Sequence, residues 1–164
     1  MTEKQIFVRE WMTSPVEVIE PTTPVSDAYN TMMQHNIRRL PVVEHGRLVG
    51  IITLGDLREA RPSPATSLSI YELNYLLSKL TVSQVMTHNP YTATPDTPIQ
   101  QAARTMLELK IGGLPVVDED GRPVGIITES DIFRMLVDQW PNFTHSSDES
   151  SILASTATNE TEKG

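Results

Sequence analysis

The sequence contains no cysteine among its 164 residues. Disulfide bonds, thiolate nucleophiles and cysteine metal ligands are therefore excluded together. Basic residues are also few, with 13 Lys and Arg against 21 Asp and Glu and a formal net charge of −8. A chain with this charge has no general attraction for nucleic acid or for an anionic membrane. We therefore expect neither nucleic acid nor a membrane as a partner.

Long hydrophobic runs are missing too, because the apolar stretches fall far short of the roughly 20 residues that span a bilayer. The start, MTEKQIFVREWMTS, mixes charges with few apolar residues and differs from a secretion signal. The few glycines build neither a Walker loop nor a GxGxxG fingerprint, and the four histidines lie in separate segments. We expect a soluble cytoplasmic protein with no metal site, no catalytic cofactor and no enzymatic activity.

What the sequence does contain is an internal repeat. Residues 8–44 align with residues 82–118, and after one extra residue in the second copy, residues 46–57 align with residues 121–132. Both copies contain LPVV, and later VGIIT followed by an aspartate three residues after the threonine. Two copies with this much identity indicate a duplication.

Each copy is predicted to form a short strand, a helix, two strands and a last helix, which is a mixed α/β (α+β) class. The strands near 16–19 and 91–93 precede a Thr-Pro dipeptide, and apolar residues at helical spacing follow it. The LPVV and VGIIT runs, joined by a turn at Gly46 or Gly121, indicate a buried hairpin. Since neither copy can bury its sheet alone, we expect the copies to pack face to face with pseudo-twofold symmetry.

The predicted domain organisation has four parts. The first repeat covers residues 7–61, a linker with a helix covers 62–81, the second repeat covers 82–140, and the polar tail 141–164 is expected to be disordered. In the linker, Ser69 and Glu72 fit a capping box ahead of an apolar helical stripe. The stripe is expected to pack on the module or on a second chain, which favours a homodimer.

The repeated Thr-x-x-Asp motif, Thr53 with Asp56 and Thr128 with Asp131, has two interpretations. It can be a capping box that needs no ligand. It can also bind a ribose phosphate, since a threonine hydroxyl donates to phosphate and an aspartate accepts from ribose hydroxyls. A small hydrolase built on these aspartates lacks a base, a nucleophile and a metal constellation.

The repeats, with LPVV, VGIIT and the following aspartate, resemble the CBS domain, named after cystathionine beta-synthase. The resemblance covers about residues 7–60 and 82–137, and the linker and stand-alone architecture further resemble CBS proteins of the AcuB type. Such domains occur in pairs called Bateman modules. The resemblance implies binding of AMP, ADP, ATP or S-adenosylmethionine in the clefts between the repeats, regulation of an unknown partner protein, and a homodimer.

The resemblance also implies which residues bind the nucleotide. Threonine and aspartate of the repeated motif would hold phosphate and ribose, and the threonine and alanine around the Thr-Pro dipeptide would line adenosine. Backbone near Val18 and Ile19, or near Thr92 and Ala93, would meet the adenine edge. By the cross-over arrangement of the family, each pocket combines the two repeats. One pocket would join Thr23 and Ala28 to Thr128 and Asp131, and the other Thr97 and Ala102 to Thr53 and Asp56.

The copies differ just before LPVV, where the first has Arg38 and Arg39 and the second has Gly112 and Gly113. In the family a basic residue there grips phosphate, so the arginines could supply charge-assisted hydrogen bonds. The glycines offer only backbone N–H groups and close approach. Two unequal pockets are therefore expected. The leading hypothesis is a non-catalytic, nucleotide-sensing regulatory module, and the alternative is a ligand-free dimerisation module with vestigial pockets.

Overall fold

The computed structural model describes residues 4–61 and 67–140. The predicted tail, 141–164, lies outside the described residues. The chain divides into two units, Met1–Ile132 and Phe133–Gly164. The first unit holds both hairpins and both Thr-x-x-Asp motifs, so the candidate site can be described within it.

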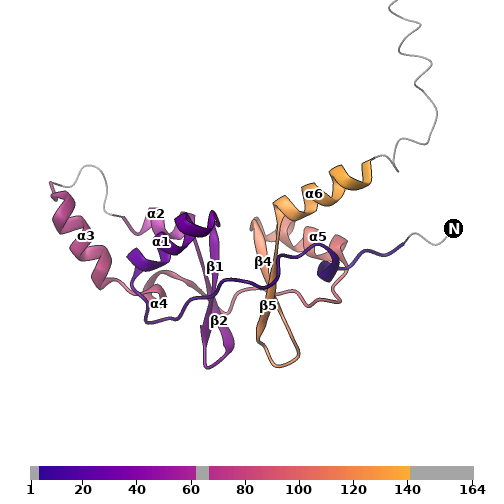
Figure 1. Cartoon of the computed structure of the whole chain (residues 1–164), viewed down its shortest axis with the longest axis horizontal. Helices are drawn as coiled ribbons and strands as arrows, with labels where there is room; N and C mark the ends of the chain where they lie inside the picture. Colours follow the sequence, from indigo (N-terminus) through magenta and orange to yellow (C-terminus); the bar gives the residue numbers. More distant parts are fainter. Residues whose placement is uncertain (1–3, 62–66, 141–164) are drawn as a thin grey trace, which may run out of the picture. The chain divides into compact units, whose positions relative to one another are not determined.

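The predicted order of helix, hairpin and helix is confirmed in both repeats (Figure 1). The first repeat has α1 (Val25–His35), β1 (Arg39–Glu44), β2 (Arg47–Thr53) and α2 (Leu54–Glu59). The second has α5 (Ile99–Leu109), β4 (Gly113–Val117), β5 (Pro123–Thr128) and α6 (Glu129–Gln139). The connecting segments add a 3-10 helix, η1 (Val8–Glu10), and the elements α3 (Ile70–Lys79), α4 (Val82–Val85) and β3 (Thr87–His88).

The short strands predicted at 16–19 and 91–93 are wrong as strands. Each reduces to a single parallel bridge, from Ile19 to Val42 and from Ala93 to Val116. Prolines at positions 15, 21, 90 and 95 surround these segments, and proline cannot donate to a ladder. The chain therefore touches the hairpin edge at one residue and then turns away.

The hairpins are antiparallel, with Leu40 opposite Ile52 in the first and Leu114 opposite Ile127 in the second. The turns need a left-handed backbone, and Gly46 and Gly121 supply it at φ 78° and 77°. The strands bury their apolar side chains against the preceding helix. The prolines expected in the first turn of that helix, Pro24 and Pro98, stand one position earlier, at the N-cap. The core of the first repeat includes Ala28, Met32, Leu40, Val42 and Ile52.

The first residues of each repeat pack on the other repeat. Strand β3, near the start of the second repeat, pairs with β2 of the first, with Thr87 opposite Ile51. In the same way Thr13, near the start of the first repeat, exchanges backbone hydrogen bonds of 2.9 and 3.0 Å with Ile126. This reciprocal exchange of segments joins the two repeats by backbone hydrogen bonds. The sequence analysis did not predict it.

Two glycines make the exchange possible. A Cβ on Gly50 would lie 2.4 Å from the sulfur of Met86, and a Cβ on Gly125 would lie 2.7 Å from the sulfur of Met12. The glycine of each VGIIT run therefore leaves room for a methionine from the other repeat's leading segment. The hairpin turns also meet, because Leu48 N–H donates to the Gly121 carbonyl at 2.9 Å. The face-to-face packing of the repeats is thus confirmed.

Helix α3 begins where the sequence predicted. Glu72 N–H donates to the Ser69 hydroxyl, and the Ser69 N–H donates to the Glu72 carboxylate at 2.8 Å. Leu77 and Leu80 pack against the core of the first repeat, so the stripe is partly covered by the module itself. Among the helices of the described segments, none is long and apolar enough to cross a membrane.

Candidate functional site

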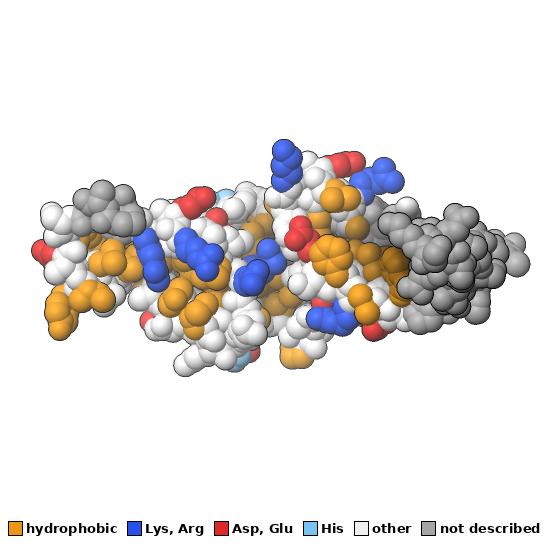
Figure 2. Space-filling model, turned by 90° about the horizontal axis from the view of Figure 1, so that it is seen from above, with side chains coloured by type: hydrophobic (Ala, Val, Ile, Leu, Met, Phe, Trp, Pro, Cys, Tyr) orange, Lys and Arg blue, Asp and Glu red, His pale blue; other side chains and the backbone are white. Residues whose placement is uncertain are grey.

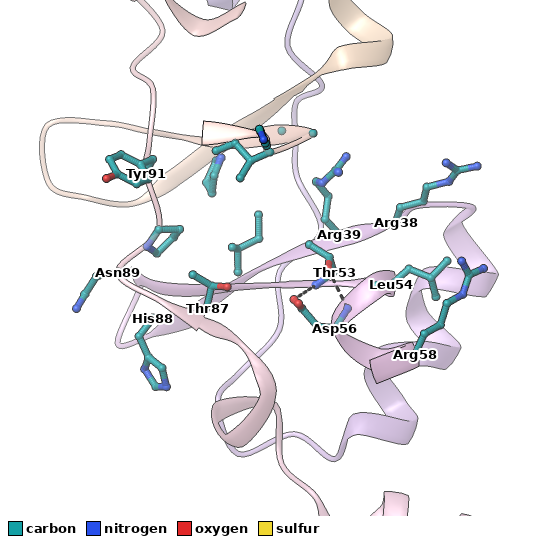
Figure 3. A pocket seen from close by; sticks show the side chains of 18 residues that line it. Arg38, Arg39, Thr53, Leu54, Asp56, Arg58, Thr87, His88, Asn89 and Tyr91 are labelled. Atoms are coloured by element: carbon teal, nitrogen blue, oxygen red, sulfur yellow. Dashed lines mark hydrogen bonds between the residues drawn. The ribbon is translucent and has the colours of Figure 1, made fainter. Parts of the chain in front are cut away.

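A pocket of about 760 Å³ lies where the first repeat, the incoming segment 87–91 and the start of β4 meet (Figure 3). This volume falls in the range of small-molecule sites, roughly 300–1,000 Å³. The first repeat supplies its Thr-x-x-Asp motif, and the second supplies its glycine pair. The lining includes Arg38, Arg39, Thr53, Asp56, Arg58, Tyr91, Lys110, Gly112 and Gly113.

Thr53 and Asp56 form a reciprocal cap in the middle of this pocket. The Thr53 N–H donates to Asp56 Oδ2 at 2.8 Å, and the Asp56 N–H donates to Thr53 Oγ1 at 3.1 Å (dashed lines in Figure 3). Among the described residues, the other carboxylate oxygen of Asp56 has no hydrogen-bond donor. The helix cap and a ligand contact are therefore compatible, because one oxygen can cap while the other faces the pocket.

The second motif is built differently. The Thr128 N–H donates to Asp131 Oδ2 at 2.9 Å, and the Thr128 hydroxyl donates to the same oxygen at 3.1 Å. Asp131 is only 3% exposed, and it is the one buried charged side chain among the residues that the structure describes. Asp131 also takes part in a further interaction. The structural role of the motif is therefore stronger in the second repeat than in the first.

Arg39 crosses from the first repeat to the second. A Cβ on Gly112 would lie 2.5 Å from Arg39 Nη2, and one on Gly113 would lie 3.0 Å from Arg39 Cδ. The glycine pair is thus the surface on which the arginine lies. Burial lowers the pKa of the Arg39 guanidinium, the Glu129 carboxylate opposes this, and the charge of Arg38 adds to the lowering. Arginine is effectively always protonated in proteins, so the group keeps its positive charge.

One wall of the pocket was missed at the level of sequence. It consists of the segment Thr87, His88, Asn89, Pro90 and Tyr91, which reaches the first repeat through β3. Arg58 and Lys110, at the end of α2 and just after α5, were missed as well. The repeated Met-Thr dipeptide at 12–13 and 86–87 was a usable signal, since it marks the two exchanged segments.

Other predicted residues lie elsewhere. Val18, Ile19 and Thr23 line a second pocket of about 580 Å³, together with Val43, His45 and Gly46 of the first repeat. Ala28 and Ala102 are buried on the core faces of α1 and α5, with 0% and 1% exposure. Thr97 Oγ1 accepts a hydrogen bond from the Thr94 N–H at 2.9 Å. The 760 Å³ pocket therefore brings together Thr53, Asp56, the arginines and the glycine pair, but not Thr97 or Ala102.

The arrangement offers binding contacts along one line. In Figure 3, Thr53 and Asp56 lie at the centre, the aromatic ring of Tyr91 lies on one side, and the guanidinium groups of Arg38 and Arg58 lie on the other. No group of three His, Asp or Glu side chains that could hold a metal ion occurs in residues 4–61 and 67–140. The side chains of the pocket therefore suit an organic anion that contains a flat ring, with the ring near Tyr91 and the negative charge near the guanidinium groups.

Comparison with known protein families gives two matches along this chain. The model of the CBS domain matches residues 8–63 and again residues 82–138. Together these ranges cover well over half of the chain. They contain both hairpins and both Thr-x-x-Asp motifs.

Comparison with known proteins gives similar results. A CBS domain-containing protein of Dictyostelium discoideum is 35% identical over 134 residues, which are 81% of this chain and 92% of that protein. L-aspartate semialdehyde sulfurtransferase of Methanocaldococcus jannaschii is 35% identical over 130 residues. This match covers 79% of the chain but only 23% of the enzyme. The chain thus spans about a quarter of the length of some relatives and nearly all of others.

Solved structures share the fold. The CBS domain pair of protein MJ0100, in complex with 5-methylthioadenosine and S-adenosyl-L-methionine, is 32% identical with a TM-score of 0.69, covering 82% of this chain and 98% of that chain. CBSX2 in complex with AMP is 33% identical with a TM-score of 0.66, covering 80% and 96%. AcuB from Vibrio cholerae is 28% identical with a TM-score of 0.70, covering 88% and 99%.

Proposed function

The chain belongs to the CBS-domain family, and from this premise we propose that it is a non-catalytic regulatory module that binds an adenine nucleotide between its repeats. The observation that carries the proposal is the order in which the groups lining the 760 Å³ pocket lie in Figure 3. A ring-stacking residue, a carboxylate with a free oxygen and a set of guanidinium groups follow one another in the order of base, ribose and phosphate. Among similar structures, CBSX2 was solved in complex with AMP, and the domain pair of MJ0100 in complex with 5-methylthioadenosine and S-adenosyl-L-methionine.

The residues have distinct roles in this proposal. The ring of Tyr91, which is 64% exposed, stacks on the base. Asp56 accepts hydrogen bonds from ribose hydroxyls, and Thr53 donates to a phosphate oxygen. Arg39, lying on Gly112, supplies a charged donor to the phosphate. The second motif, with Asp131 buried, is the weaker candidate for a second site.

Regulation requires that the nucleotide bind one arrangement of the repeats more tightly than another, since equal affinity for both leaves their equilibrium unchanged. The pocket is lined by residues of both repeats, so its affinity for the nucleotide depends on how the repeats are arranged. Arg39 of the first repeat lies on Gly112 of the second, so a phosphate that draws the guanidinium changes a contact between the repeats. We assign the readout to a partner protein, with the module acting as a homodimer in the cytoplasm.

The alternative, an assembly module with vestigial pockets, is favoured by one observation. Several large apolar side chains on helices are exposed, which is typical of interaction surfaces when they are contiguous. They include Ile70, Tyr71 and Tyr75 on α3, Leu107 on α5, and Phe133 and Val137 on α6. In this alternative the module dimerises whether or not a nucleotide is present.

The test is isothermal titration of the purified chain with AMP, ADP, ATP and S-adenosylmethionine. Saturable binding to the wild type, weakened in Asp56→Asn and unchanged in the control Glu108→Gln on the exposed face of α5, supports the proposal. Thermal melts of each variant separate lost binding from lost folding. No heat and no thermal shift with any of the four compounds would leave the assembly module as the better account, and light scattering would then report its oligomeric state.

A further inference from the structure

A further cavity lies away from the space between the repeats, where α1, the end of α2 and α3 meet. These three helices lie next to one another in Figure 1. We call this cavity, which is lined in part by Val25, Tyr29, Leu57, Arg61 and Asn74, the linker pocket. Its volume of about 420 Å³ suits a small molecule. It shares no lining residue with the 760 Å³ pocket, so it is a separate candidate site.

The floor of the linker pocket is apolar. Val25 of α1 and Leu57 of α2 are each 2% exposed and belong to the core of the first repeat. Tyr29 and Leu77 pack against the same core from α1 and α3. A small hydrated ion would lose water over this floor without gaining hydrogen bonds. A ligand that fills the pocket therefore needs an apolar part.

Polar side chains complete the lining. They are Ser26 and Asn30 of α1 and Asn74 of α3. Within residues 4–61 and 67–140, none of these three side chains has a hydrogen-bond partner. One hydroxyl and two amides offer both donors and acceptors. Since they come from two different helices, a polar ligand can bond to α1 and α3 at once.

The charge of the linker pocket comes from Arg61, which follows α2. Its guanidinium lies over the ring of Tyr29, 5.0 Å from the ring centre, an arrangement that attracts the cation and limits its motion. The N–H donors of a guanidinium lie in its own plane, so contact with a ring leaves them available. In the part of the chain that the structure describes, no carboxylate lies within ion-pairing distance of Arg61, and the lining contains no Asp or Glu.

The second repeat lacks both members of this pair. When the alignment of the repeats is continued at the same shift, Ala103 stands for Tyr29 and Leu136 for Arg61. The second repeat forms the same order of helix, hairpin and helix without them. The fold therefore does not require the ring and the guanidinium, and they occur in the copy that packs on the linker helix.

The surface around the linker pocket also suits an anion with an apolar part. Figure 2 shows hydrophobic side chains at the end of the first unit where α3 lies, and basic side chains that follow one another along the middle of the same face. The chain as a whole has a formal net charge of −8. Local positive charge on an acidic protein directs small anions to this face.

From these groups we propose that the linker pocket binds a small organic carboxylate with an apolar body, a site additional to the nucleotide pocket. The carboxylate pairs with the Arg61 guanidinium through two parallel hydrogen bonds, which is the geometry that both groups favour. The apolar body covers Val25 and Leu57, and the amide of Asn74 donates to the carboxylate. Because Arg61 and Asn74 belong to different segments, the bound carboxylate holds α3 against the first repeat.

The experiment is an NMR titration of the full-length, ¹⁵N-labelled chain with 3-methylbutanoate, in the absence of nucleotide. Three further compounds divide the recognition into parts: 3-methylbutanamide has the same body without the charge, acetate has the charge without the body, and inorganic phosphate is a different anion. The variants are Arg61→Gln and Asn74→Ala. The matched control is Arg104→Gln, an exposed arginine of α5 that the repeat alignment places opposite Asn30. Thermal melts without ligand verify that each variant is folded.

We expect 3-methylbutanoate to shift the amide signals of Ser26, Tyr29 and Asn74 saturably, with a dissociation constant on the order of 1 mM, as for a ligand of few atoms. The amide, acetate and phosphate should each bind at least about fivefold more weakly. Arg61→Gln should weaken binding of 3-methylbutanoate about tenfold and Asn74→Ala about threefold, with Arg104→Gln unchanged. Hydrogen exchange of the α3 amides should slow in the complex. Excess AMP should not displace the carboxylate.

Several outcomes would overturn this site. They are shifts confined to residues of the 760 Å³ pocket, equal affinity for the carboxylate and its amide, phosphate binding as tight as that of 3-methylbutanoate, an equal loss in Arg104→Gln, or no saturable shift at about 20 mM ligand. None of them affects the nucleotide proposal, because the two pockets share no residue. Failure of AMP and the other nucleotides to bind would overturn that proposal and leave the carboxylate site standing.

Discussion

Arg39 of the first repeat lies directly over Gly112 of the second, so closely that a Cβ on Gly112 would be 2.5 Å from Arg39 Nη2. The sequence comparison set these residues apart as the main difference between the two copies, an arginine pair against a glycine pair. In the structure they are the two halves of one contact. The duplication has diverged at complementary positions, because two arginines facing each other here would repel and overfill the space.

The first prediction concerns this contact. Gly112→Ala brings a methyl group against the far end of a flexible side chain, so Arg39 can move aside and the free energy of unfolding changes by less than about 1 kcal/mol. Displacing the guanidinium removes a phosphate donor, and we expect nucleotide affinity to fall. Urea unfolding and titration with ATP measure the two effects. In an Arg39→Ala background, Gly112→Ala should change affinity no further; an undiminished effect there would show that Arg39 is not the group displaced.

The second prediction concerns the exchanged segments. A Cβ on Gly50 would lie 2.4 Å from the Met86 sulfur and 3.0 Å from the Thr87 carbonyl oxygen, and the carbonyl belongs to backbone that cannot swing aside. We expect Gly50→Ala to lower the free energy of unfolding by about 1–3 kcal/mol, as overpacking does. The measurement is urea denaturation.

Its control is Gly55→Ala in α2. A Cβ there meets only Thr53 Oγ1, at the ordinary distance of 3.6 Å. This variant should stay within about 0.5 kcal/mol of the wild type. If both glycine variants unfold at the same urea concentration as the wild type, the exchanged methionine does not depend on Gly50.

The third prediction separates the two Thr-x-x-Asp motifs by stability. Asp131→Ala removes a buried carboxylate and leaves the Thr128 N–H without its acceptor, which we expect to cost about 1–3 kcal/mol. Asp56→Ala removes the equivalent cap at a half-buried position and should cost about 1 kcal/mol. Chemical denaturation of both variants, with Glu108→Ala as an exposed control, measures the difference. A larger loss in Asp56→Ala than in Asp131→Ala would contradict the asymmetry of the motifs.

The fourth prediction concerns pH. Hydrogen bonds from the Ser69 backbone N–H and hydroxyl lower the pKa of the Glu72 carboxyl below its usual range. Since the lowered value belongs to the folded helix, the cap of α3 contributes fully above the unfolded pKa, and its contribution disappears as pH falls through the folded pKa. An NMR titration of the Glu72 carboxyl and the helical circular dichroism should follow the same curve.

Two variants make this pH prediction sharp. Ser69→Ala removes the hydroxyl donor, so the Glu72 pKa should rise toward its ordinary value. Glu72→Gln keeps an acceptor that does not titrate, and the start of α3 should then be insensitive to pH in this range. A Glu72 pKa that does not move in Ser69→Ala would mean that the capping box is not what lowers it.

Local sequence signals predicted the elements well. The Thr-Pro dipeptides start α1 and α5, the glycines at 46 and 121 turn both hairpins, and Ser69 with Glu72 begins α3. Each of these features depends on residues only a few positions apart. Periodicity and capping chemistry act over the same short range, which is why a single sequence is enough to detect them.

The candidate site was predictable in part. Thr53, Asp56, Arg38, Arg39 and the glycine pair were chosen from the repeated motif and from its differences, and they share one pocket. Tyr91, Arg58 and Lys110 carried no motif, and no local pattern marks them. The placement of Thr97 and Ala102 in that pocket came from the family's arrangement and stays a prediction about the nucleotide complex.

The sequence by itself determined that this chain is a duplication, where its helices and hairpins lie, and that a Thr-x-x-Asp motif stands at the start of the last helix of each repeat. Only the tertiary structure decided that the first residues of each repeat cross to the other, that Gly112 is the surface for Arg39, and that four distant cations surround one pocket. The physical reason is the separation along the chain of the residues that interact. Caps and turns are settled between neighbours along the chain, whereas packing and electrostatics act between groups that are close only once the chain has folded.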